Sequence, residues 1–170
     1  VARVLGFTAE ADNYLAQSEA KKVAFNEIYV DKTTHKTIKS GVKTGFMGPP
    51  NANAAPDVSD KGQLMDTQAS YAIPLALGTF NATNAPHALT HLVSTITRSN
   101  TDDQGVARPP YSLMTGFIGT ASISEALSAN GKHDIAYGLL TTKTYPSWLY
   151  SVANGATSIW ERLNSYTIEN

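Results

Sequence analysis

The spacing of apolar residues restricts the fold of this chain more than any other feature. Apolar residues recur every three or four positions in several segments of the 170-residue sequence, and no segment shows a sustained two-residue alternation. Such spacing places side chains on one face of a helix, whereas alternation is typical of a half-buried strand. Loops rich in Gly, Pro and Asn separate the segments. The pattern predicts an all-α fold built of αα-hairpins.

The pattern predicts five helices. We expect them over residues 9–29, from Asp66 to about Gly78, over 86–97, up to Asn130, and from near His133 to before Pro146. Thr8 and Asp66 are the expected N-caps of the first two, and the first helix is expected to be amphipathic. Residues 29–43 are expected to form a turn or hairpin, and residues 41–62 and 100–110 to form loops. A loop of about 20 residues in a compact domain is usually functional or disordered.

Charge and polar composition limit the partners of the chain. The 13 basic and 14 acidic residues give a net charge of -1, which argues against a nucleic-acid partner. Charged residues make up only 16% of the chain, and 19 Thr, 14 Ser and 11 Asn supply neutral hydrogen-bonding groups instead. Such a surface suits an extracellular protein or a sugar partner. The N-glycosylation sequon at residues 81–83 also permits a secreted origin, although the sequence does not specify a compartment.

We expect no metal, cofactor or membrane span. The absence of cysteine excludes disulfides, a cysteine-based zinc site and thiol catalysis. His87 and His91 have the spacing of a helical ligand pair, but Ala88 stands where an HExxH motif requires glutamate. Surface or capping roles are therefore favoured for the histidines. The longest apolar stretch, residues 71–77, is far shorter than the ~20 residues of a spanning helix.

Two long stretches, residues 67–97 and 144–160, carry no formal charge, and we expect each to be buried or to line a cleft. The second contains Trp148 and Trp160 and leads directly to Glu161. A desolvated glutamate beside a tryptophan suits general acid or base chemistry, because burial raises the pKa of a carboxyl group toward the working pH. An ion pair at a helix start is the alternative for Glu161. For the tryptophans, core packing is the alternative to stacking on a sugar.

Several motifs occur in an order and spacing that resemble the C-terminal half of the catalytic domain of glycoside hydrolase family 78, the α-L-rhamnosidases. The similarity extends over about 100 residues. The motifs are DTQASYA (66–72), TGFIGT (115–120), SANGKHDIAY (128–137), YPSW (145–148) and NGATSIWER (154–162).

The resemblance implies part of an (α/α)6 barrel with the active site in a cleft at one end. It also implies inverting hydrolysis that releases terminal α-L-rhamnose from a glycoside or polysaccharide. Inverting enzymes use two carboxyl groups about 6.5–9.5 Å apart, and Glu161 matches the residue to which the family assigns the general base. Arg162 would orient or charge-balance that carboxylate, unless it forms a structural salt bridge. Trp148 and Trp160 are candidates for the wall of the sugar site.

The sequence also departs from the family pattern. The acidic motif that holds the general acid has no match before Asp66, the expected sugar-contacting histidine would lie beyond the chain, and Leu149 replaces a common glycine. Five helices are too few for a twelve-helix barrel. We therefore expect residues 1–170 to be a partial catalytic domain, truncated at both ends. Alone, it should be inactive and need the remainder of its own domain.

Two alternatives remain open from the sequence. The first is another (α/α)-barrel glycosidase that acts on a different sugar. The second is a non-catalytic helical module that binds carbohydrate or another partner.

Overall fold

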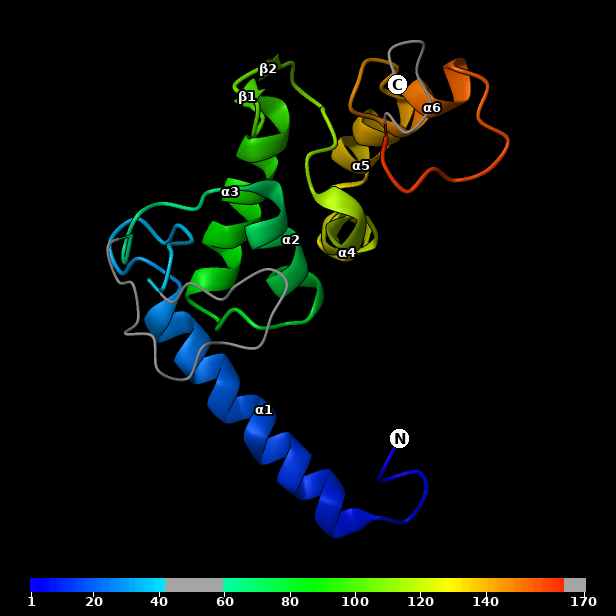
Figure 1. Ribbon diagram of the computed structural model, residues 1–170. Helices are drawn as coiled ribbons and strands as arrows, with labels where there is room; N and C mark the ends of the chain where they lie inside the picture. Colours follow the sequence, from blue (N-terminus) through cyan, green and yellow to red (C-terminus); the bar gives the residue numbers. More distant parts are fainter. Residues whose placement is uncertain (42–59, 164–170) are drawn as a thin grey trace, which may run out of the picture.

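The computed structural model describes residues 1–41 and 60–163 (Figure 1). Within these residues the chain is mostly helical, which confirms the all-α prediction. The elements are α1 (Thr8–Ile28), α2 (Gln68–Ala76), α3 (Asn84–Thr97), β1 (Asn100–Thr101), β2 (Ala107–Arg108), α4 (Gly116–Ala129), α5 (His133–Thr141) and α6 (Trp148–Ala153).

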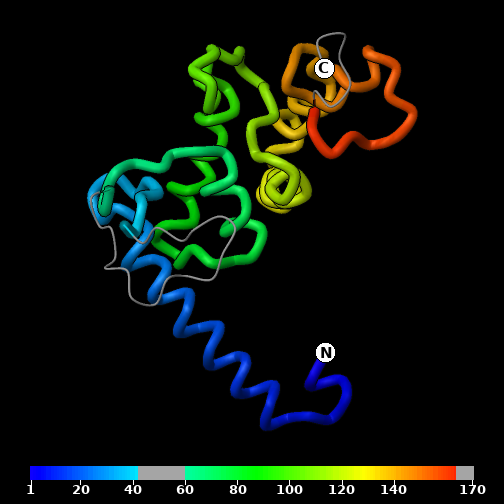
Figure 2. The backbone as a smooth tube through the Cα atoms, viewed as in Figure 1, coloured from blue at the N-terminus to red at the C-terminus, as the bar shows by residue number. Residues whose placement is uncertain are grey.

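Helix α1 forms where the spacing predicts it, but its N-terminal half does not bury an apolar face. Tyr14 and Leu15 are 67% and 55% exposed, so the amphipathic interpretation is wrong for this half. The predicted cap is also wrong, because Phe7 occupies the N-cap position and no side chain caps the helix. Near the other end, Phe25 packs against the core and Asn26 is buried. Figure 2 shows the N-terminal half of α1 extending away from the other helices.

Helix α2 is capped by Thr67, not by the predicted Asp66. The Thr67 hydroxyl accepts a hydrogen bond from the Ser70 N–H, and the Ser70 hydroxyl accepts one from the Thr67 N–H, which completes a capping box. Thr67 has the extended backbone that an N-cap requires, whereas Asp66 is left-handed, with φ +42°. The Asp66 carboxylate is thereby free to bond elsewhere.

The core lies between α2, α3 and α4, with α2 in contact with both of the others (Figure 1). Its largest fully buried side chains include Tyr71, Leu92, Ile96, Ile123 and Leu127. Helices α4 and α5 form an αα-hairpin through the predicted Asn130–Gly131 turn, and Gly131 has the positive φ that this turn requires. On α5, any side chain at Gly138 would clash with the ring of Tyr111.

The sequence prediction lacks one helix and two short strands. Helix α6 begins after Ser147, whose hydroxyl accepts a hydrogen bond from the Tyr150 N–H at 3.1 Å. Strands β1 and β2 pair antiparallel within the predicted 100–110 loop. Residues 29–41 form the expected turn, in which Val30 pairs with Thr37. Most of the predicted 41–62 loop lies outside the described residues.

Candidate active site

The residues predicted to act on a sugar lie on α6 and in the segment that follows it. Trp148 is the first residue of α6, is half-buried and packs against the core. Trp160 is half-buried, whereas Glu161 and Arg162 are exposed. The Ser151 hydroxyl donates a hydrogen bond to the Leu163 carbonyl at 3.3 Å, and Leu163 packs against the core. This bond ties the segment that carries Glu161 to α6.

The prediction that residues 144–160 are buried or line a cleft is wrong for the second half of this stretch. Residues 152–159 are exposed, apart from the half-buried Ala156. Among the residues that the structure describes, no side chain forms a hydrogen bond or ion pair with Glu161. The described residues therefore do not provide the desolvation expected around this carboxylate, and they leave it open to water.

A groove of about 320 Å³ runs beside Trp148 between α4, α5 and α6. Half of the residues that line it are leucine, isoleucine or alanine, and the others are Trp148, Tyr137 and the polar Ser124, Ser128 and His133. Trp148 thus contacts the core and also forms part of a groove wall. The two roles considered for this tryptophan are compatible.

A cluster around Tyr145 precedes α6. The Arg108 guanidinium lies over the Tyr145 ring, 4.6 Å from its centroid, and the Tyr145 and Tyr150 rings meet edge-on at 5.3 Å. Arg108 also bonds to the Asp102 carboxylate at 2.7 Å. The N–H of Val106 and the Arg108 side chain hold the pKa of Asp102 below its usual value. Sequence reasoning missed this cluster, because Asp102 and Arg108 lie in a stretch expected to be loop.

A second charged cluster surrounds Asp66, at the start of α2. Its carboxylate accepts hydrogen bonds from the Tyr71 hydroxyl at 2.7 Å, Lys36 Nζ at 2.9 Å and Arg98 Nη1 at 3.2 Å. Burial raises the pKa of Asp66, but the three donors outweigh burial and the pKa lies below its usual value. Burial and the neighbouring Asp66 raise the pKa of Tyr71. These bonds make Asp66 a structural anion.

Gln68 holds the residues that precede α4. Its side-chain amide donates to the carbonyls of Thr95 and Ser112, at 3.3 and 2.9 Å, and accepts from the Met114 N–H at 2.8 Å. The residue is only 3% exposed. Gln68 therefore holds the chain immediately before the Thr115–Gly116 motif against α2 and α3.

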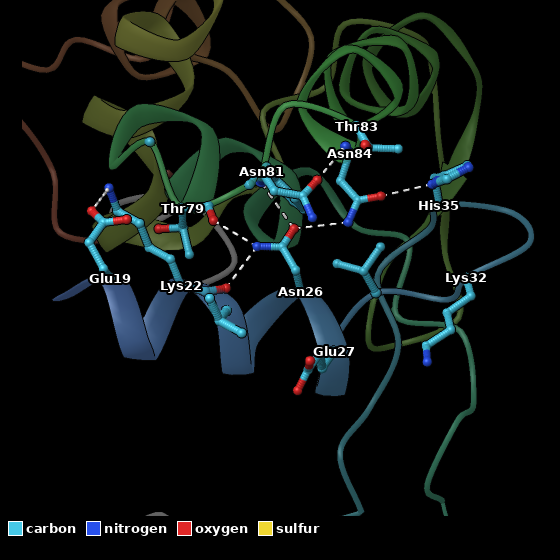
Figure 3. Close-up of a pocket in the computed structure, with 14 residues that line it drawn as sticks. Glu19, Lys22, Asn26, Glu27, Lys32, His35, Thr79, Asn81, Thr83 and Asn84 are labelled. Atoms are coloured by element: carbon cyan, nitrogen blue, oxygen red, sulfur yellow. Dashed lines mark hydrogen bonds and ion pairs between the residues drawn. The ribbon is translucent and has the colours of Figure 1, made fainter. Parts of the chain in front are cut away.

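A larger cleft, of about 520 Å³, lies between α1, the 31–37 turn and the start of α3 (Figure 3). Asn26 donates to the carbonyls of Lys22 and Thr79, and its own carbonyl accepts from the Asn81 N–H and from Asn84 Nδ2. All four hydrogen-bonding positions of this amide are therefore used. Asn26 fastens the C-terminal end of α1 to α3, which is a structural role.

Histidines also line this side of the molecule. The His35 ring stacks on His87 with centroids 4.0 Å apart, and His91 Nε2 lies 3.0 Å from the Thr34 carbonyl oxygen. In residues 1–41 and 60–163, no three His, Asp or Glu side chains are placed to hold a metal ion. No helix in these ranges is long and apolar enough to cross a membrane.

Comparison with known proteins decides the family. The model of the bacterial alpha-L-rhamnosidase 6 hairpin glycosidase domain matches residues 1–170. The chain belongs to this family. The six-hairpin domain is an (α/α)6 barrel, so the helices described above are part of such a barrel, as the sequence motifs imply.

Three curated relatives of the chain are alpha-L-rhamnosidases. Those of Alteromonas sp. (strain LOR) and Formosa agariphila are 38% and 41% identical over 104 and 101 residues, which are 61% and 59% of the chain. The Streptomyces avermitilis protein is 33% identical over 139 residues, or 82% of the chain. The matched residues span only 10%, 10% and 12% of these relatives.

Solved structures agree with the six-hairpin assignment. The native alpha-L-rhamnosidase of Aspergillus terreus superposes on this chain with a TM-score of 0.68 at 25% identity. The match covers 97% of this chain and 15% of the Aspergillus chain. The Streptomyces avermitilis alpha-L-rhamnosidase complexed with L-rhamnose gives a TM-score of 0.67 at 25% identity, over 99% of this chain and 12% of its own.

Proposed function

We propose that the chain is a segment of an inverting glycosidase that releases terminal α-L-rhamnose from rhamnosides, with Glu161 as the general base. The observation that carries the proposal is the family match over residues 1–170. It is combined with an exposed carboxylate in the Trp160–Glu161–Arg162 motif that has no partner among the described residues. A general base must have a free lone pair that water can reach, and Glu161 meets this requirement within the described residues.

In this mechanism Glu161 removes a proton from water as the water oxygen attacks the anomeric carbon. The bond to the leaving oxygen breaks on the opposite face of the sugar, and a carboxylic acid protonates that oxygen. The general acid belongs to the remainder of the catalytic domain, so residues 1–170 alone should not hydrolyse rhamnosides appreciably. We assign Trp148 and Trp160 to the sugar wall. Arg162 follows Glu161 in the chain, and we assign it to balancing the charge of the Glu161 carboxylate, because no direct bond joins the two side chains in the described residues.

Substitution of Glu161 in the protein that carries this chain tests the proposal. Glu161→Gln should lower kcat for an aryl α-L-rhamnoside by about 10² to 10⁴-fold, because it removes proton transfer from water. Glu161→Ala with added azide should give β-L-rhamnosyl azide, since azide needs no general base. Glu125→Gln, the same change on the exposed face of α4, serves as the control.

The same assay separates the alternatives. Near-normal turnover of Glu161→Gln would overturn the base assignment. Hydrolysis of other aryl glycosides, but not of the rhamnoside, would favour another barrel glycosidase. Binding of rhamnose without any hydrolysis would favour a non-catalytic module.

A further inference from the structure

We propose that Arg108 is a positioning residue for the site that contains Trp148 and Glu161. Its guanidinium holds the Tyr145 ring, and Tyr145 begins the segment that carries both residues. The kinetic consequence rests on the proposed function, whereas the positioning itself can be measured without catalysis.

The guanidinium is fixed from one side by Asp102. Arg108 Nε and Nη2 both bond to Asp102 Oδ2, at 2.8 and 2.7 Å. The other carboxylate oxygen, Asp102 Oδ1, accepts the N–H groups of Gln104 and Val106 at 3.0 and 2.8 Å. The Arg108 side chain is only 21% exposed. An arginine held in this way retains a defined plane, which a flexible lysine does not.

The guanidinium also contacts an aromatic ring. Arg108 lies 4.6 Å from the centroid of the Tyr145 ring, within the range of a cation–π contact. Tyr145 in turn meets the Tyr150 ring at 5.3 Å with an interplanar angle of 66°. Arg108 on β2 therefore contacts Tyr145 directly and Tyr150 only through the Tyr145 ring, and Trp148 lies between the two tyrosines in the chain.

Backbone contacts connect this stretch to the Glu161 segment. The Leu113 N–H donates to the Pro146 carbonyl at 2.8 Å, and Ser147 caps α6. Ser151, next to Tyr150, bonds to the carbonyl of Leu163 at 3.3 Å. Leu163 is two residues from Glu161. A shift of the Tyr145 ring can therefore move α6 and the segment tied to its end.

The experiment uses the protein that carries this chain. It measures the environment of Trp148 and the rate of hydrolysis separately. 5-Fluorotryptophan is incorporated, and the ¹⁹F resonances of Trp148 and Trp160 are assigned with Trp148→Phe and Trp160→Phe. We expect Arg108→Ala to shift or broaden the Trp148 resonance, and Arg108→Lys to do so less. Arg3→Ala removes an exposed ion pair to Asp12 and should leave the resonance unchanged.

Kinetics provide the second readout. Arg108→Ala should lower kcat for an aryl α-L-rhamnoside about 10-fold while KM changes less than about twofold, because misplacement of reacting groups mainly affects the transition state. Tyr145→Leu should have the same effect, and the double variant should be no worse than either single variant. Tyr145→Phe keeps the ring and should behave as the wild type.

Two results would overturn the inference. The first is an unchanged Trp148 resonance in a folded Arg108→Ala variant. The second is a normal kcat in Arg108→Ala when Glu161→Gln is inactive. A wild-type protein that does not hydrolyse rhamnosides, but shows the Trp148 shift in Arg108→Ala, would overturn the proposed function and support the positioning role.

Discussion

The start of α2 and the segment after α6 use their polar residues in opposite ways. Asp66 and Gln68 are largely buried. To parts of the chain distant in sequence, the Gln68 side chain makes three hydrogen bonds and the Asp66 carboxylate makes two. Glu161 is exposed, and the described residues give it no partner. The polar side chains at the start of α2 therefore hold the fold together, whereas the candidate base Glu161 keeps its lone pairs available for water.

The largest expected effect is on the α2 side of this comparison. Gln68→Ala should lower the free energy of unfolding by about 3 kcal/mol, because it leaves the Ser112 carbonyl and the Met114 N–H buried without partners. Urea denaturation followed by circular dichroism measures the change. Gln104→Ala, on the exposed turn between β1 and β2, is the control. Equal effects of both variants would remove the contrast between the two regions.

Asp66→Asn should lower the free energy of unfolding by about 2 kcal/mol at neutral pH, since hydrogen bonds to a charged group are stronger than those to a neutral one. The pKa of Asp66 is lowered in the folded state from an ordinary value of 3.8. Stability from this carboxylate is therefore full above pH 3.8 and is lost as pH falls through the lower folded-state pKa. The Tm values of wild type and Asp66→Asn should therefore converge over that acidic range. A difference in Tm that stays constant with pH would contradict the prediction.

Ser147→Ala tests how firmly α6 is held. Loss of the hydrogen bond from the Tyr150 N–H to the Ser147 hydroxyl should cost about 1 kcal/mol, the usual effect of removing an N-cap. Differential scanning calorimetry measures it, with the exposed Ser158→Ala as the matched control. If the two serine variants melted together, the cap would contribute nothing to stability.

The smallest expected effect belongs to the candidate base itself. Glu161→Gln should change the free energy of unfolding by less than about 0.5 kcal/mol, as is usual for an exposed side chain, because no residue in 1–41 or 60–163 bonds to Glu161. Urea denaturation alongside Asp66→Asn gives a direct comparison of the two carboxylates. A cost as large as that of Asp66→Asn would mean that Glu161 is also a structural anion.

Periodicity predicted the two 14-residue helices well, because three- and four-residue spacing persists over about four turns of α3 and α4. It could not reveal α6, whose six residues span fewer than two turns. The cap of α2 was misassigned because Asp66 and Thr67 are both good capping residues, and backbone conformation decides between them.

The candidate site was predicted less fully than the fold. Motif spacing identified Trp148, Trp160, Glu161 and Arg162, but lack of charge was a poor guide to burial, since residues 152–159 are exposed apart from Ala156. The contact of Arg108 with Tyr145 joins residues 37 positions apart and leaves no periodic signal. Such pairs become visible only when the fold brings them together.

The buried amide of Asn26 holds one end of α1, so the two halves of this helix differ in local stability. The 21 residues span about 31 Å, yet only the C-terminal end is fastened to α3. Backbone amides near Tyr14 can exchange with solvent deuterium through local fraying, which costs little free energy. Amides near Asn26 must wait for the network with Asn81 and Asn84 to open. One continuous helix should therefore show two exchange lifetimes, with the boundary between Tyr14 and Asn26.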